Sequence, residues 1–84
     1  MAKRRKKFLC LDCQVDTGAI GEHYFIHTDT WFQAHASKEG MLCIGCLEKR
    51  LKRRLTARDF PAVYINDPKF GIKSERLLDR LRSS

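Results

Sequence analysis

Leucines at every fourth position mark the clearest predicted element of the chain. Leu47, Leu51 and Leu55 together span only about 80° of a helical wheel, because each residue turns a helix by about 100°. Glu48 falls in the first turn and cations follow in the last, as is common at the two ends of a helix. The pattern predicts an amphipathic helix over about 46–55.

The region before this helix favours strands. Residues 22–28 are rich in aromatic and β-branched side chains, and alternation would place Tyr24 and Ile26 on one face of a strand. A shorter strand at 41–43 is expected to pair with it. These two segments predict a short β-hairpin.

Capping residues place the other helices. Thr30 with Gln33 fits a capping box, which favours a short helix over 30–36 rather than a second strand. Ser74 can cap a last helix over 75–82. This helix is expected to pack on the core through Leu77, Leu78 and Leu81.

The segment between the two leucine-rich helices reads as turns and extended chain. Thr56 and Asp59 resemble a second capping box, with Asp in place of Glu, before a short turn. Residues 61–73 are expected to be extended, with a turn at 66–68.

A length of 84 residues limits the size of the core. A chain of this size buries only about 60–65% of its surface on folding, and such domains often need disulfides or a metal. The length excludes a two-domain enzyme, and the longest apolar run is too short to span a membrane. We expect a flexible basic arm over 1–8 and one domain over 9–84. The basic start lacks the apolar stretch of a secretory signal, so a cytoplasmic protein is expected.

Four cysteines carry the most specific chemistry. They form two CxxC pairs, Cys10 with Cys13 and Cys43 with Cys46, separated by 29 residues. A CxxC loop turns tightly enough for both sulfurs to reach one ion, so two loops supply four thiolates for a tetrahedral zinc site. Four protein ligands leave no open position for water or substrate, and this predicts one structural zinc ion per chain.

Other uses of the cysteines remain alternatives. Disulfides, iron, an iron–sulfur cluster and a redox CxxC all employ the same residues. The lack of a secretory signal argues against disulfides, and redox motifs occur singly whereas this chain has two pairs. Zinc would also contribute on the order of 10–16 kcal/mol to folding, which suits a small core.

The order of elements predicts a small α+β zinc-binding domain. A first CxxC loop, a β-hairpin and a second CxxC at the start of an amphipathic helix form a treble-clef-like arrangement, followed here by a C-terminal helix. The helix N-terminus favours anionic thiolates at the second pair. Such a fold says little about function by itself.

Two strings give a closer resemblance. Residues 41–48 read MLCIGCLE and residues 55–60 read LTARDF. With these strings the chain resembles a group of small four-cysteine zinc proteins of actinobacteria and their phages, over most of 9–82. The resemblance implies the fold and the zinc site, but no activity.

Charge favours a nucleic-acid partner. The net charge of +7 is concentrated in two blocks, because residues 1–7 carry five cations and no acid, and residues 47–58 carry six cations and one acid. Phosphate backbones attract such blocks. The expected contacts are Lys3, Arg4, Arg5, Lys6, Lys7, Lys49, Arg50, Lys52, Arg53 and Arg54.

Two other function classes compete with this interpretation. A protein-interaction adaptor, such as a phage protein acting on a host protein in the host cytoplasm, would use the acidic 12–39 region with Trp31 and Phe32. An HNH-type nuclease would need histidines as base and metal ligands, and His23 and His27 would lie about 13 Å apart on a strand. We therefore expect a protein that is not an enzyme.

Overall fold

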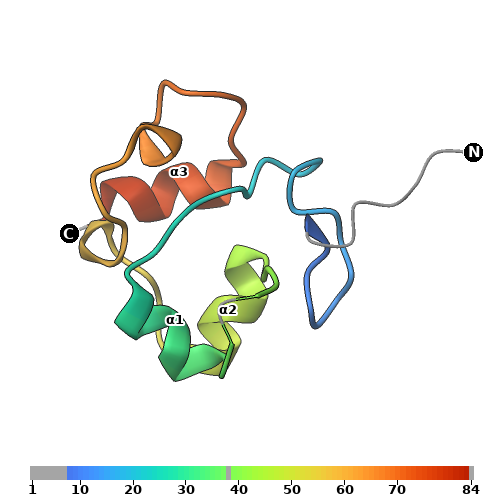
Figure 1. The fold of residues 1–84 in the computed structure, drawn as a ribbon. Coiled ribbons are helices and arrows are strands. Elements are labelled where there is room, and N and C mark those ends of the chain that lie inside the picture. The colour runs from blue at the N-terminus through green and yellow to red at the C-terminus, as the bar shows by residue number, and fades with distance from the viewer. Residues whose placement is uncertain (1–7, 38, 84) are drawn as a thin grey trace, which may run out of the picture.

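The computed structural model describes residues 8–37 and 39–83, which fold into three helices and two 3₁₀ turns (Figure 1). The elements are α1 (Thr28–Ala34), α2 (Ile44–Leu51), η2 (Ala57–Asp59), η3 (Tyr64–Asn66) and α3 (Glu75–Arg82). In Figure 1, α3 lies on one side of the molecule and α1 and α2 on the other, with residues 22–27 crossing the view between them. The basic arm expected over 1–8 lies almost wholly outside the described residues.

The expected β-hairpin is not formed. Met41 pairs with Cys10 in an isolated parallel bridge, and its carbonyl accepts a hydrogen bond from Leu11 N at 2.8 Å. Residues 22–27 are extended without a partner strand, because their backbone is bonded elsewhere. The side-chain amide of Asn66 hydrogen-bonds to both backbone groups of Phe25: its Oδ1 accepts from Phe25 N at 3.0 Å, and its Nδ2 donates to Phe25 O at 2.9 Å. Side chains and loops thus replace the second strand.

The expected facing of this extended segment is nevertheless confirmed. Tyr24 is buried and donates from its hydroxyl to Leu42 O at 2.6 Å, and Ile26 packs against the core. Phe25 points the other way and is half exposed. Alternation requires only an extended backbone, so it holds without a sheet.

The short helix α1 begins two residues before its expected start. His27 is the N-cap and makes no side-chain capping bond, so the Thr30–Gln33 capping box is wrong. The box at 56–59 is confirmed, because Asp59 Oδ2 accepts from Thr56 N at 2.8 Å at the start of η2.

The C-terminal helix is confirmed at both ends. Ser74 Oγ accepts from Leu77 N at 3.0 Å, which satisfies one of the free N–H groups in the first turn of α3. Leu77 is fully buried and Leu81 packs against the core, whereas Leu78 is only half buried.

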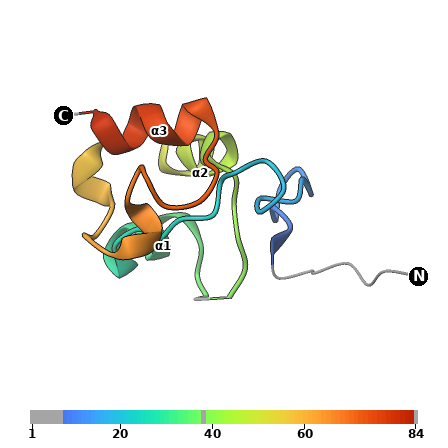
Figure 2. The same cartoon turned by 90° about the horizontal axis from the view of Figure 1, so that it is seen from above.

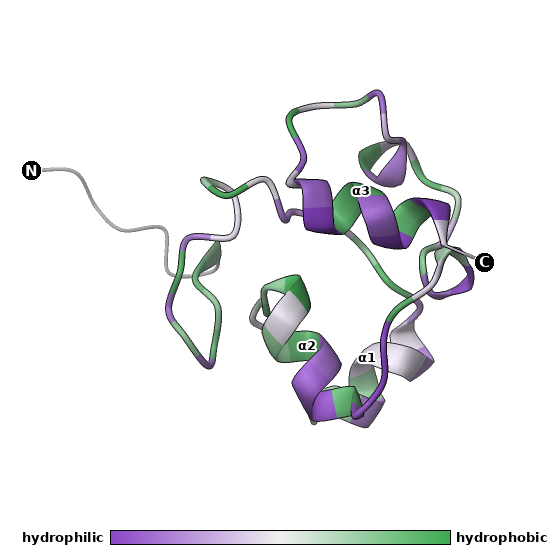
Figure 3. Cartoon of the chain, turned by 180° about the vertical axis from the view of Figure 1, so that it is seen from behind, coloured by the Kyte–Doolittle hydropathy of each residue, from purple (hydrophilic) through white to green (hydrophobic). Residues whose placement is uncertain are grey.

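The helix α2 is shorter than expected and shifted toward the N-terminus. It begins after Cys43 and ends at Leu51, because Lys52 takes the left-handed conformation with φ 61°. Beyond that residue Glu48 Oε2 accepts from Leu55 N at 2.8 Å, which turns the chain so that Leu55 is fully buried. Figure 3 shows the resulting change along α2, from an apolar first half to a hydrophilic second half.

The buried core is small and depends on two cysteines. Among the described residues its apolar members are Cys10, Tyr24, Leu42, Cys43, Ile44, Leu47, Leu55, Phe60 and Leu77. None of the nine comes from α1 or from residues 61–73, and Trp31 of α1 covers the cluster only partly. A core this small leaves a large share of the stability to other interactions.

A buried carboxylate, Glu22, joins three parts of the fold. Its side chain is 2% exposed and accepts hydrogen bonds from Ile44 N at 2.8 Å and Ser74 Oγ at 2.8 Å. Arg76 adds two more bonds, at 3.0 and 2.9 Å. Burial raises the pKa of Glu22, but Arg76 and the other donors outweigh this effect and hold the pKa below its usual range. Glu22 therefore fixes the starts of α2 and α3 relative to each other.

A second ion pair ties the two helices together farther along. Glu48 in α2 accepts two hydrogen bonds from Arg80 in α3, at 2.7 and 3.1 Å, and both side chains are largely buried.

Gly21 contacts the start of α3, since its carbonyl accepts a hydrogen bond from Ser74 N at 2.9 Å. Glycine is required there, because φ is +76° and a Cβ would lie only 2.7 Å from Ser74 N.

Within the described residues, none of the helices is long and apolar enough to cross a membrane.

We predict that Glu22→Gln destabilises the protein by about 2–3 kcal/mol. The amide cannot match the carboxylate toward Ile44 N, Ser74 Oγ and Arg76, and it leaves the guanidinium without its counter-charge. Urea denaturation of the metal-loaded protein measures the loss. Glu39→Gln, at an exposed position, is the matched control and should stay within about 0.5 kcal/mol of wild type. Equal stabilities of the two variants would contradict the assigned role of Glu22.

Candidate metal centre

The structure brings the four predicted cysteines into one cluster. The sulfurs of Cys10, Cys13, Cys43 and Cys46 all lie within 4.8 Å of one another. Cys13 Sγ and Cys43 Sγ are 3.8 Å apart, which matches the edge of about 3.8 Å expected for a tetrahedron with metal–sulfur bonds of about 2.3 Å. The cysteines are therefore arranged to hold one metal ion.

The first pair lies in a tight loop. Cys13 N points at Cys10 Sγ at 3.5 Å, and Gln14 N donates to Cys10 O at 2.9 Å. Gln14 adopts φ 64°, and Cys10 N closes the loop on Val15 O at 2.8 Å. The backbone thus turns back on itself and presents both sulfurs on the same side.

The second pair lies at the N-terminus of α2. Cys43 is the N-cap and Cys46 lies in the first turn. The free N–H groups and the positive end of the helix dipole favour anionic sulfur at this place. The bridge between Met41 and Cys10 then brings the first loop against the second pair.

The thiols do not ionise equally without a cation. Burial raises the pKa of Cys10, but backbone N–H groups, first that of Cys13, lower it overall to about 6. At Cys46, burial and the neighbouring thiols together raise the pKa well above its ordinary value. Four thiolates at this spacing therefore need a positive charge among them, which a bound metal ion would supply.

The geometry argues against two of the alternatives for the cysteines. All four are free, and a sulfur separation of 3.8 Å is far from the disulfide bond length of about 2.05 Å. A four-iron cluster binds each thiolate to a different iron and spreads the sulfurs apart, whereas these four sulfurs lie within 4.8 Å of one another, close enough to bind a single ion.

Two arginines that were not assigned to this site from the sequence lie beside it. Arg76 bonds chiefly to Glu22, and the charge of Cys43 further raises its pKa. Arg50 bonds chiefly to Asp12, and Cys10 and Cys46 raise its pKa further. Their positive charges offset the negative charge of a thiolate-bound ion. Arg76 lies 30 residues beyond Cys46, so local spacing gave no signal for its role.

The expected cationic face of one helix is not formed. Because α2 ends at Leu51, Arg53 and Arg54 lie beyond it. Arg53 binds Asp59 with two bonds of 3.0 and 2.7 Å, and Arg54 binds Asp79 at 2.7 Å.

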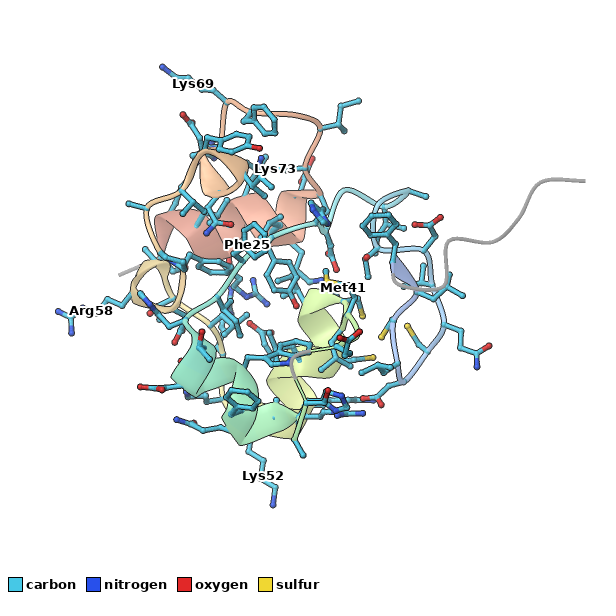
Figure 4. All side chains as sticks on the ribbon, viewed as in Figure 1. Phe25, Met41, Lys52, Arg58, Lys69 and Lys73 are labelled. Atoms are coloured by element: carbon cyan, nitrogen blue, oxygen red, sulfur yellow. The ribbon has the colours of Figure 1, made fainter. Side chains whose placement is uncertain are left out.

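The third arginine of that block is also paired. Arg50 binds Asp12 through two bonds of 3.0 and 2.6 Å and donates to Ala34 O. Of the five predicted contacts near α2, Lys49 and Lys52 have no ion pair within the described residues, and Figure 4 shows Lys52 pointing away from the body. Lys3, Arg4, Arg5, Lys6 and Lys7 lie outside the described residues. Contact of any of these ten residues with nucleic acid stays a prediction.

The acidic region expected to suit a protein partner is also partly used inside the fold. Asp12 pairs with Arg50, and Glu22 is buried. Trp31 packs partly against the core and donates from Nε1 to Ser37 O at 2.7 Å, while Phe32 remains exposed.

The histidines do not belong to the cysteine cluster, and the described part of the chain holds no other cluster of metal-ligand side chains. His23 packs against the Phe8 ring, and its Nδ1 is buried with no hydrogen-bond partner. His35 Nδ1 lies 3.2 Å from Arg50 Nη1, and His27 is the N-cap residue of α1 without a side-chain capping bond.

Comparisons of the chain with protein families, curated proteins and solved structures found no match. The resemblance to small actinobacterial and phage zinc proteins stays a prediction that rests on residues 41–48 and 55–60.

We predict one bound metal ion per chain and its loss in Cys43→Ser. Because metal binding and folding are coupled, this variant should lose its cooperative thermal transition and most of its helical signal. Elemental analysis and thermal melts by circular dichroism measure both effects. Cys13→His is the matched control, because Cys13 is exposed and imidazole can replace a thiolate ligand. It should keep metal and a cooperative transition, and a metal-free, cooperatively folded Cys43→Ser variant would contradict the prediction.

Proposed function

We propose that the protein is a non-enzymatic module, folded around one structural zinc ion, that binds nucleic acid through its basic arm (Lys3–Lys7). Zinc suits four thiolates in a tetrahedron, and four protein ligands leave no position for catalysis. The phosphate backbone is the partner that five adjacent cations attract most generally.

The distribution of charge is the observation that carries this proposal. Residues 8–84 hold twelve of the 17 cations and all ten acidic residues, a difference of two. Four thiolates and one Zn²⁺ contribute two negative charges, so the loaded body is close to neutral. Nearly the whole excess positive charge therefore belongs to the basic arm, which directly precedes the first cysteine loop.

The ion pairs of the body support the same division. Arg50, Arg53 and Arg54 each bind a carboxylate within the fold, and phosphate would have to displace it. Among the five contacts predicted near α2, Lys49 and Lys52 are exposed and have no ion pair within the described residues, so they are the ones best placed to add contacts. We therefore assign the main phosphate contacts to the basic arm and secondary contacts to these two lysines.

A protein-binding adaptor is the second candidate, and one observation favours it. A hollow of about 260 Å³ opens beside α1 and is lined mainly by apolar side chains, including Phe25, Trp31 and Met41. Figure 4 shows Phe25 and Met41 near each other on the viewed face. A partner with an apolar side chain would fit there, and its binding would not depend on the basic arm.

We predict that binding to duplex DNA depends steeply on salt through the basic arm. With four to six phosphate contacts, the slope of log K against log salt should be about −4 to −5. Replacing all five arm cations with glutamine should flatten this slope by about 4, because these charges are the ones that release counterions. Fluorescence-anisotropy titrations at several salt concentrations measure both slopes.

Lys49→Gln with Lys52→Gln is the matched control in the folded body. Two lost contacts should flatten the slope by less than about 2 and leave the zinc content unchanged. Absence of saturable binding by the wild type to either duplex or single-stranded DNA at about 50 mM salt would overturn the proposal and favour the adaptor.

A further inference from the structure

We infer that the aromatic loop (residues 61–73) is a stacking platform for the bases of single-stranded nucleic acid. This inference rests on the proposed function and names the form of nucleic acid that the protein prefers. Tyr64 and Phe70 are the stacking side chains, and Lys69 and Lys73 are the flanking cations. Flat aromatic faces beside positive charges are the features with which proteins bind unpaired strands without sequence preference.

The two rings are exposed although the domain has few large apolar residues. Tyr64 is 69% exposed and Phe70 is 48% exposed. Their centroids lie 4.9 Å apart with the planes at 86°, so the rings support each other edge to face. Apart from this contact, the exposed parts of the two rings add no burial to the fold and are available to a ligand.

The loop is held in place, so the rings are presented in a defined position. Asn66 is buried and bonds through its amide to both Phe25 backbone groups and to Pro61 O. Asp67 forms a turn in which its carboxylate accepts from Lys69 N at 2.9 Å and its carbonyl accepts from Phe70 N at 2.9 Å. A ligand therefore meets a preformed surface and orders little of the protein on binding.

Positive charge accompanies the rings. Lys73 Nζ lies 5.7 Å from the centroid of Phe70 and donates to Phe70 O. Figure 4 shows Lys69 pointing outward from the loop, with Lys73 on the same side of the molecule. Asp67 is the acidic residue of the loop, so the loop carries a net charge of +1. The charge complements a phosphate backbone lying along the rings.

A hollow of about 410 Å³ adjoins the exposed ring. Its lining includes the apolar side chains of Pro61, Pro68 and Leu81 beside Tyr64, and the polar side chains of Asn66 and Asp67. This volume accommodates a base that leaves the stack on Tyr64. In duplex DNA the bases are paired and their faces are covered by neighbouring bases. The rings of the aromatic loop therefore cannot stack on the bases of a duplex.

The test compares an oligothymidylate of about 15 nucleotides with a duplex of the same length. In anisotropy titrations, Tyr64→Leu should weaken single-strand binding about tenfold, because leucine keeps the apolar volume and removes the aromatic face. Tyr64→Phe should bind like wild type, and Phe70→Leu should repeat the loss. Duplex binding should change less than about twofold in all three variants, and their melting temperatures should match wild type because both rings are exposed.

Ile72→Ser is the matched control. Ile72 lies in the same loop and is 94% exposed, but it has no aromatic face. The inference of a stacking platform is wrong if Ile72→Ser weakens single-strand binding as much as Tyr64→Leu does. It is also wrong if Tyr64→Leu binds single strands like wild type. Saturable, arm-dependent duplex binding in that case would leave the proposed function standing. Binding of neither single strand nor duplex would overturn both.

Discussion

The four converging thiolates are the constraint on which the rest of this fold depends. Cys10 and Cys43 are members of the buried core as well as the sulfurs of the candidate metal centre. Apart from the Cys10 side chain, the first cysteine loop is joined to the rest of the described chain mainly by the backbone pairing of Cys10 and Leu11 with Met41 and by the ion pair of Asp12 with Arg50. Figure 2 shows this loop set apart from the three helices. A metal ion that binds all four sulfurs therefore fixes the loop to the start of α2, and its binding energy is folding energy.

Arginine–carboxylate pairs supply cohesion that a larger domain would draw from its core. Glu22 with Arg76 and Glu48 with Arg80 hold α3 to α2, and Arg50 with Asp12 holds the first cysteine loop to the end of α2. Exposed pairs contribute little, but the first two each contain a largely buried carboxylate that accepts several hydrogen bonds. Because these arginines are engaged inside the fold, a high count of cations near α2 does not make a free cationic surface.

The parts of the structure that follow from local chemistry were predictable, and the parts that follow from distant side chains were not. Ser74 and the leucines after it define α3, and the CxxC spacing defines the metal centre, since each depends on residues a few positions apart. The expected hairpin is absent because Asn66, 41 residues away, takes the backbone groups of Phe25. Glu48, which accepts from Leu55 N beyond the early end of α2, is itself held by Arg80, 32 residues away. No local pattern contains such partners.

The aromatic loop exposes large apolar side chains although the buried core of the protein is small. The described core includes only nine buried apolar side chains, yet the aromatic loop keeps Tyr64, Phe70 and Ile72 exposed. Burying any of them would add about 1.5–3 kcal/mol to a fold with a small core. Asn66 and Asp67 instead fix the loop in an open conformation. Stability alone does not favour a loop whose polar residues keep apolar side chains exposed to water. Contact of those side chains with a ligand explains their exposure.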